Sequence, residues 1–283
     1  LDRIPAVLDE FEVGVLRDQY RHETQLTKRL RHGLTWWKFQ IFIRRLARQF
    51  DRSTVVSNLE RDHLGEIGCD LAKIAVIPNG VNTPALPAVC AAKIRRLIYP
   101  GSVQYAANLD AVRFFALDIL PRIRAVLPDM EFMVTGAIEG VDISSVAACE
   151  GVTFTGRVDD VDSLIVGSLA CVVPLRVGGG TRLKILHAMA LATPVISTSK
   201  GVEGLDADAD RHLLIADDPE KFVAQVVQLL NEPALAKRLG EEGRRLVQER
   251  YAWGPIAGQL DRVIRDAVVA RQSQVASRER SRL

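Results

Sequence analysis

The sequence has 283 residues, of which 48% are hydrophobic and 25% charged, and its formal net charge is +2 at pH 7. These values are ordinary for a globular protein, and they exclude a disordered chain, a collagen-like repeat and a small disulfide-stapled protein. The charge balance gives no general attraction to nucleic acid, and the length allows one large domain or two ordinary ones.

The first part of the chain is unusually basic. Residues 17–52 include ten Lys or Arg and three Asp or Glu, a net charge of +7. Apolar side chains interleave with these cations at Trp36, Trp37, Phe39, Ile41, Phe42, Ile43 and Leu46. Two interpretations stay open: a core helix with a solvated basic face, or a surface that meets anionic lipid headgroups. Nucleic-acid binding is disfavoured because no recognition module accompanies the basic segment.

Short elements follow this basic segment. Residues 52–57 predict a β-branched strand that ends in a polar cap, and a helix is expected from about Leu59. Residues 74–81 predict a strand that ends in a Pro-Asn-Gly turn. Residues 82–93 contain two prolines and no clear periodicity, which is typical of a linker between domains. We therefore expect domains at residues 1–90 and 91–255, with a C-terminal helix and polar tail over 256–283.

From Arg95 onward, apolar runs alternate with helical patterns. The strand-like runs are 97–99, 131–135, 152–155, 170–174, 194–198 and 213–216. The helical patterns between them are 111–126, 161–168, 182–191 and 221–230. Continuous apolar strands separated by helices predict an α/β fold with a doubly wound, Rossmann-like parallel sheet. Ligands of such sheets bind beyond the C-terminal ends of the strands.

Glycines stand at the ends of the first three predicted strands of this region. Gly101 and Ser102 end the first strand, where a ligand site and a plain turn are both possible. Gly136 ends the second strand and Gly156 the third, and both would allow a base or ribose to lie close to the backbone. The spacing is not that of a dinucleotide-binding GxGxxG motif.

The fourth strand leads into a glycine-rich loop and a basic helix start. Gly178, Gly179, Gly180 and Thr181 precede Arg182 and Lys184. Cations at a helix N-terminus oppose the helix dipole, and a bound anion would resolve that conflict. We therefore predict a diphosphate site here, against the alternative of a flexible loop with two solvated cations. His187, on the same helix, either hydrogen-bonds a ribose hydroxyl or is a satisfied buried histidine.

Two other patterns give no site. Asp206, Asp208, Asp210 and Asp217 imitate the spacing of a calcium loop, but Arg211 occupies the position that needs glycine. A solvated acidic loop is the favoured interpretation, and no metal site is predicted. The four cysteines Cys69, Cys90, Cys149 and Cys171 form no CxxC pair, so we expect reduced core residues and a cytoplasmic location. No apolar run reaches the roughly 20 residues that span a membrane, and residues 1–10 lack a signal-peptide pattern.

Several motifs together resemble the group 1 (family 4) glycosyltransferases. The main segment is Val177-Gly-Gly-Gly-Thr-Arg-Leu-Lys-Ile-Leu-His-Ala-Met-Ala190, followed by 193–198 and 201–205. The segments 77–81, 100–102, 108–111, 155–159 and 251–253 match the family as well. The resemblance covers residues 50–264. Within the family the chain is similar to the branch associated with bacterial exopolysaccharide and exosortase gene clusters.

The resemblance implies a GT-B fold and transfer of a sugar, with retention at the anomeric carbon, from a nucleotide-diphosphate sugar to an acceptor hydroxyl. It implies no metal or other cofactor, and Arg182, Lys184 and the amides of 178–181 would bind the diphosphate. Gly101 and Ser102 would lie under the sugar phosphate, and Gly156, Arg157 and Val158 beside the base. The expected partners are the nucleotide-sugar donor and a saccharide or lipid-linked acceptor. Peripheral contact with the inner face of an anionic membrane is also expected, but no contact with nucleic acid.

The chain departs from the family pattern in two ways. The family's glutamate pair, eight residues apart, falls on Gly179 and His187. The segment before the linker has room for only the last helices and one or two strands of the acceptor-side domain, so we expect a truncated second Rossmann-like domain and a chain cut at its start. The alternatives to a transferase are a non-catalytic donor-domain remnant and a nucleotide-sugar epimerase.

Overall fold

The computed structural model describes residues 4–9, 13–86 and 94–280. It divides into two compact units. Unit 1 comprises Leu1–Gly80, Gly179–Thr181 and Trp253–Leu283, and unit 2 comprises Val81–Gly178 and Arg182–Ala252. The chain thus divides near residues 80 and 252, whereas the sequence predicted domain limits at residues 90 and 255. The C-terminal helix, expected to stand alone, is grouped with unit 1.

Unit 2 contains a six-stranded parallel sheet in the order β6-β5-β4-β7-β8-β9. The strands are β4 (Ile94–Pro100), β5 (Glu131–Thr135), β6 (Val152–Gly156), β7 (Ser168–Val173), β8 (Val195–Ser197) and β9 (Leu214–Ile215). Counted within the unit, this is the strand order 3-2-1-4-5-6 of a doubly wound Rossmann-like fold. The predicted α/β class and parallel sheet are confirmed.

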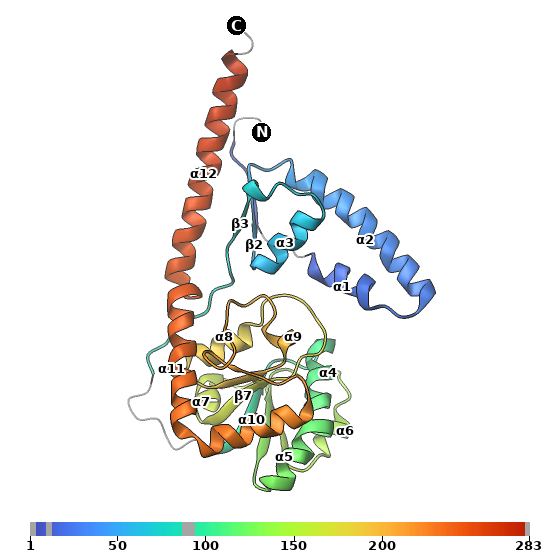
Figure 1. The fold of residues 1–283 in the computed structure, drawn as a ribbon, viewed down its shortest axis with the longest axis vertical. Helices are drawn as coiled ribbons and strands as arrows, with labels where there is room; N and C mark the ends of the chain where they lie inside the picture. The colour runs from blue at the N-terminus through green and yellow to red at the C-terminus, as the bar shows by residue number, and fades with distance from the viewer. Residues whose placement is uncertain (1–3, 10–12, 87–93, 281–283) are drawn as a thin grey trace. The chain divides into compact units, whose positions relative to one another are not determined.

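Helices cover both faces of this sheet (Figure 1). One layer is formed by α4 (Ala106–Phe114), the π-helical turn η2 (Phe115–Ile119), α5 (Leu120–Val126) and α10 (Pro219–Asn231). The other layer includes α7 (Val161–Val166), α8 (Leu183–Ala190) and α11 (Pro233–Arg250). The short helices α6 (Ser144–Ala147) and α9 (Ser199–Val202) complete the connections.

Aromatic side chains join the first helix layer to the sheet. The ring of Phe115 lies 4.4 Å from that of Phe132 on β5 and 5.8 Å from that of Phe222 on α10, measured between centroids. All three side chains are fully buried, so they contribute apolar area as well as ring contacts to the core. This core fixes the strands whose ends form the candidate site.

Unit 1 contains a smaller parallel sheet in the order β1-β2-β3. Its strands are β1 (Val7–Leu8), β2 (Arg52–Val55) and β3 (Ile74–Val76), and its helices are α1 (Gly14–His22), α2 (Leu26–Ala47), α3 (Asn58–Glu66), the 3-10 turn η1 (Leu71–Lys73) and α12 (Trp253–Arg280). Three strands occur where one or two were expected. Ser57 caps α3 as predicted, because its hydroxyl accepts a hydrogen bond from the Glu60 amide at 3.2 Å.

Some sequence-based expectations differ from the structure. The helix expected over 111–126 begins earlier, at Ala106, and includes the π-helical turn before Pro121. Proline has no N–H, so the regular helical pairing is interrupted at this point. Of the cysteines, Cys171 is buried, but Cys69 and Cys149 are only half-buried and are not core residues. Cys90 lies outside the described residues.

Candidate functional site

The candidate site lies where the strand order of unit 2 reverses. The chain passes outward from β4 through β5 to β6 and then returns to β7 on the other side of β4. Such a reversal leaves the C-terminal ends of two adjacent strands with their connections leading in opposite directions, which opens a crevice for ligands. Gly101 follows β4 and Gly178 follows β7 by a few residues. Gly101 and Gly178 therefore follow the two strands between which this fold is expected to bind its ligand.

The backbone is closely packed at the ends of β4 and β5. Gly136 has φ +105°, and a Cβ added there would lie 2.7 Å from the amide nitrogen of Ser102. Only glycine fits this approach of two chain segments. The Gly136 amide also donates to the carbonyl of Gly156 at 2.8 Å, which connects the end of β5 to the end of β6. The structure thus brings Gly101, Ser102, Gly136 and Gly156 together along one edge of the sheet.

Lys184 reaches from α8 to the end of β4. Its Nζ donates to the Tyr99 hydroxyl at 2.6 Å and to Asn108 Oδ1 at 2.9 Å, and it lies 3.9 Å from the centroid of the Tyr99 ring. These contacts use two of the three donors of the ammonium group. A Cβ on Gly101 would lie 2.9 Å from Nζ, so the missing side chain at this position makes room for the cation.

The same network fixes the turn after β4. The Tyr99 hydroxyl donates to Asn108 Oδ1 at 2.7 Å, and Asn108 Nδ2 donates to the Ser102 carbonyl at 2.7 Å. Asn108 lies in the family-like segment 108–111, but nothing in the sequence connected it to Lys184, and Tyr99 was not among the predicted site residues. Tyr99 is fully buried in the strand, where an aromatic residue is expected for packing alone.

Burial is the main cause that lowers the pKa of Lys184 to about 7, and the nearby Arg182 charge acts in the same direction. Desolvation disfavours the charged form of an amine, which explains the direction. Burial also raises the pKa of Cys171 to about 12, so this thiol stays neutral beneath the lysine. Lys184 is therefore a cation whose charge depends on pH in the neutral range.

Arg182 holds the glycine-rich loop. Its side chain is buried, and Nη2 donates to the carbonyl of Gly178 at 2.7 Å. Gly178 has φ +103°, and a Cβ there would lie 3.1 Å from Cβ of Ala107 and 3.3 Å from the Tyr105 hydroxyl on the segment that begins α4. Gly179, Gly180 and Thr181 connect Gly178 to Arg182. The guanidinium of Arg182 therefore stabilises the loop in addition to any role toward an anion.

His187 has a specific partner on a neighbouring helix. Its Nε2 lies 2.7 Å from Oδ1 of Asp162 on α7, and the His187 side chain is one-third exposed. His187 thus has a hydrogen-bond partner without being buried, and its contact to a ribose hydroxyl stays a prediction. Asp162 was not predicted as a site residue, because it lies 25 residues away in the chain and on another helix.

The remaining predicted residues lie at the outer part of the site. Arg157 is exposed and lies 3.9 Å from Glu139 through its Nε, and Val158 is 37% exposed. Both follow β6 directly. Their exposed side chains extend from the same sheet edge as Gly156.

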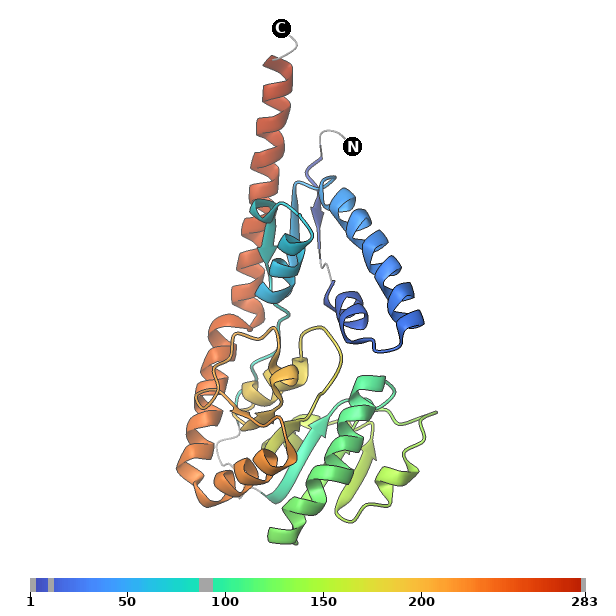
Figure 2. The same ribbon diagram turned by 45° about the vertical axis from the view of Figure 1, so that its right-hand side comes forward.

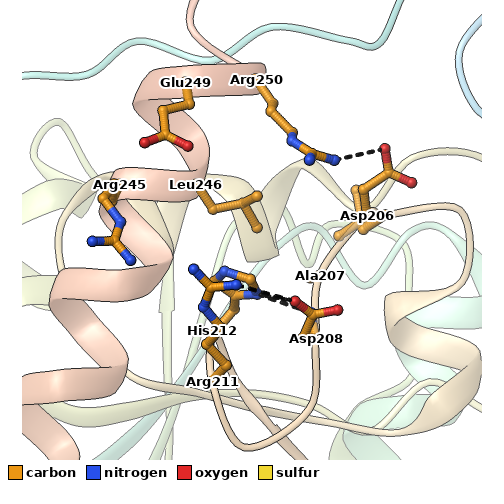
Figure 3. Close-up of a pocket in the computed structure, with 10 residues that line it drawn as sticks. Asp206, Ala207, Asp208, Arg211, His212, Arg245, Leu246, Glu249 and Arg250 are labelled. Atoms are coloured by element: carbon orange, nitrogen blue, oxygen red, sulfur yellow. Dashed lines mark hydrogen bonds and ion pairs between the residues drawn. The ribbon is translucent and has the colours of Figure 1, made fainter.

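The acidic loop after β8 forms a separate cavity of about 490 Å³ (Figure 3). Asp206 pairs with Arg250 at 3.3 Å, and Asp208 lies 3.7 Å from Arg211 and 3.6 Å from Nδ1 of His212. Burial lowers the pKa of His212, and its Nδ1 accepts from the Asp208 amide at 2.9 Å. Asp206 and Asp208 thus pair with cations and are also 51% and 69% exposed, which agrees with the expected solvated acidic loop. Among the described residues, no group of three or more His, Cys, Asp or Glu side chains is arranged to hold a metal ion.

Comparison with known proteins identifies the family. Residues 94–232 match the family described as "Glycosyl transferases group 1", and residues 19–84 match "Glycosyltransferase Family 4". The chain belongs to the group 1, family 4 glycosyltransferases. The resemblance inferred from the sequence motifs is confirmed.

A curated relative of this glycosyltransferase is the MMP α-(1→4)-mannosyltransferase of Mycolicibacterium hassiacum. It is 27% identical over 251 residues, which are 82% of this chain and 58% of the relative. The chain therefore spans little more than half the length of that enzyme.

Solved structures show the same fold. TarM of S. aureus has a TM-score of 0.66 at 17% identity, with 80% of this chain and 46% of TarM covered. Anabaena Alr3699/HepE in complex with UDP and glucose has a TM-score of 0.69 at 13% identity, with 93% of this chain and 72% of HepE covered. These similarities confirm the predicted GT-B type of fold.

Proposed function

We propose that this glycosyltransferase moves a sugar from a nucleotide-diphosphate sugar to an acceptor hydroxyl group, with retention of configuration at the anomeric carbon. The observation that supports it best is the convergence of Lys184, Gly101 and the Arg182-stabilised loop at the strand-order reversal of unit 2. The HepE complex with UDP and glucose supports a nucleotide-sugar donor for this fold.

Arg182 and Lys184 are the proposed catalytic groups. Departure of a nucleoside diphosphate builds negative charge on the phosphate oxygens, and preorganised cations and amides stabilise that charge. Lys184 has two of its three donors engaged by Tyr99 and Asn108, which orients the ammonium without using all of it. The amides of 178–181 and the turn at Gly101 and Ser102 would complete the diphosphate site, with Gly136, Gly156, Arg157 and Val158 toward the nucleoside.

His187 is the proposed contact to the donor ribose. Asp162 binds its Nε2 and thereby orients the ring, so the other ring nitrogen is available in the proposal to a ribose hydroxyl. No metal cofactor is part of the proposal, since the two cations neutralise the leaving group. A chelator that abolished transfer would contradict this assignment.

The acceptor in this proposal is a saccharide or a lipid-linked sugar in bacterial polysaccharide or glycoconjugate synthesis. The location is the cytoplasm, with peripheral contact at the inner face of the membrane. The described cysteines Cys69, Cys149 and Cys171 are all free thiols, which supports a reducing compartment. In the described part of the chain, no helix is both long and apolar enough to span a bilayer.

Donor binding and transfer test the proposal in sequence. A thermal-shift panel of UDP, GDP, ADP and their sugars identifies the donor, because a ligand that binds only the folded state raises the melting temperature. Turnover is then measured with that donor and candidate acceptors, and the product's anomeric configuration is read by NMR. A free new sugar formed without acceptor would indicate an epimerase instead.

Lys184→Met is the sharpest variant, because methionine keeps most of the side-chain volume. We expect turnover to fall roughly 10²- to 10³-fold, the usual effect of removing one group that stabilises a developing anion. Lys237→Met on α11 is the matched control, since Lys237 is exposed. Arg182→Ala should weaken donor binding as well. Circular dichroism distinguishes the loss of a contact to the diphosphate from a loss of folded structure around the glycine-rich loop. Unchanged donor affinity and turnover in Lys184→Met would refute the phosphate assignment.

A further inference from the structure

The helix α2 has two chemically different sides. Trp36 and Ile43, seven residues apart, point into the core of unit 1. The adjoining side is covered by α1, where the Tyr20 ring packs against Gly33 and Arg29 lies over the same ring. This side of α2 agrees with the expectation of a core helix with a solvated basic face. Figure 2 shows α2 alongside α1, with its remaining side not covered by another described element of unit 1.

The uncovered side has a row of large apolar side chains. Leu26, Leu30, Leu34 and Trp37 are 72%, 68%, 53% and 58% exposed. Their spacing of four, four and three residues places them along one line of an α-helix. Single exposed apolar residues are common, but a contiguous row marks a surface that contacts another molecule.

A second row combines cations with an aromatic residue. Arg31, Lys38 and Arg45 are exposed and follow one another at intervals of seven residues. Phe42, 57% exposed, lies between Lys38 and Arg45 at helical spacings of four and three. The two rows are adjacent on the helix, so each apolar side chain has a cation nearby.

No acidic residue compensates this charge within α2. The helix sequence contains six Lys or Arg and no Asp or Glu. In the described part of the chain, the recorded ion pairs of this region join Arg17 and Arg21 of α1 to Glu66, and none involves a cation of α2. The uncovered side thus combines unpaired positive charge with exposed apolar area.

We propose that this side of α2 binds the surface of an anionic lipid bilayer, with the helix axis parallel to the membrane. The 22 residues of α2 span about 33 Å, and along that length leucine, tryptophan and phenylalanine can enter the headgroup region while lysine and arginine contact lipid phosphates. We call this surface the basic-apolar face. It comprises Leu30, Leu34, Trp37, Lys38, Phe42 and Arg45.

The positive charge of the basic-apolar face favours an anionic lipid bilayer over a second copy of the chain as its binding partner. Two basic-apolar faces brought together would oppose like charges along their length, which disfavours association. An anionic bilayer instead supplies negative charge and an apolar layer directly beneath it, matching both rows at once. The inference rests on the proposed function, because it assigns a surface to the peripheral membrane contact included there. Lipid binding is measured without donor or acceptor, so it is tested separately from sugar transfer.

Vesicle flotation tests the inference with the full chain. Vesicles of phosphatidylcholine containing one-third phosphatidylglycerol should bind the protein at low salt, and binding should weaken at high salt. Pure phosphatidylcholine vesicles should bind far less. The charge variant Lys38→Glu/Arg45→Glu should lower binding roughly tenfold or more, because each basic residue near the surface contributes measurably to the attraction.

A matched control and an apolar variant complete the test. Arg95→Glu/Lys237→Glu changes net charge equally at exposed positions outside α2 and should retain binding. Trp37→Ala/Phe42→Ala should reduce binding without lowering the melting temperature, since both side chains are exposed. In a Trp253→Phe background, bilayers of brominated lipid should quench Trp37 fluorescence.

Several outcomes would overturn the inference. The first is that the protein does not bind anionic vesicles, and the second is that it binds neutral vesicles equally well. The third is that the control variant loses as much vesicle binding as the variants of the basic-apolar face. Self-association at rising protein concentration that disappears in Trp37→Ala/Phe42→Ala, with no vesicle binding, would assign the face to a second copy. Loss of transfer activity with intact vesicle binding would refute the proposed function and leave this inference standing.

Discussion

At the scale of single residues, Lys184 has contacts that the sequence did not predict. As one of two cations at a helix start, it was predicted to face an anion. The structure adds two internal partners, Tyr99 and Asn108, which are 85 and 76 residues away in the chain. No local pattern contains such a contact, because it depends on the parallel order of the strands. The glycines of the site were predictable, since a turn at a strand end selects glycine locally.

The lowered pKa of Lys184 predicts that donor affinity depends on pH. Burial lowers this pKa to about 7, so in the free protein the Lys184 amine is mostly charged below that pH and mostly neutral above it. A diphosphate binds the charged form, and affinity should fall roughly tenfold between one pH unit below and one above this pKa. Calorimetry with a nucleotide sugar measures it, because its phosphates do not titrate in this range.

Lys184→Met supplies the control for this profile. Its affinity should be lower than that of the parent at acidic pH and should show no comparable decline on raising the pH. A parent affinity that stayed constant across the range would mean that Lys184 does not contact the anion.

At the scale of elements, a buried carboxylate connects two helices of unit 1. Glu60, in the first turn of α3, accepts hydrogen bonds from the amides of Val13 at 2.9 Å and Gly14 at 3.2 Å, where α1 begins. Negative charge at a helix N-terminus also interacts favourably with the helix dipole. The sequence predicted α3 from its Ser57 cap but gave no sign of this role, because α1 and α3 are far apart in the chain.

Glu60→Ala should therefore destabilise unit 1 by about 1–3 kcal/mol, since one buried and one partly buried amide lose their acceptor. Urea unfolding followed by tryptophan fluorescence measures the change, because Trp36, Trp37 and Trp253 all belong to unit 1. Glu66→Ala is the control: Glu66 is half-exposed, and such ion pairs contribute about 1 kcal/mol or less. Equal effects of the two substitutions would show that the buried acceptor is unimportant.

At the scale of the whole molecule, the two units differ in the size of their cores. The core of unit 1 consists of Val13, Trp36, Ile43, Val55, Leu64, Ile67 and Ile74. That of unit 2 includes buried residues of every strand except β6, which packs partly buried side chains against it, and of most helices. Sequence periodicity predicted the architecture of unit 2 because its strands are continuous apolar runs. It described unit 1 less well, since there the apolar residues alternate with cations and part of them stays exposed.

The smaller core predicts that unit 1 unfolds first. Burial of less apolar area gives a lower free energy of unfolding, so tryptophan fluorescence should change at a lower urea concentration than a probe in unit 2. Cys171 is such a probe, since its thiol is fully buried and should react with a thiol reagent only after unit 2 opens. The measurement needs a variant with Cys69, Cys90 and Cys149 replaced by serine. Coincident transitions would show that the units unfold together.

The π-helical turn between α4 and α5 has a consequence for insertions and deletions. Ala111, Phe115, Ile119 and Ile123 are all fully buried and recur at intervals of four residues. In a uniform α-helix each such step would rotate the side chain by about 40°, so Ile123 would turn away from the sheet. The wider turn at Phe115–Ile119 offsets part of that drift. Deleting one residue there would rotate α5 by about 100° about the helix axis and expose its aliphatic face to water. Shortening an exposed loop would not rotate any helix against the sheet.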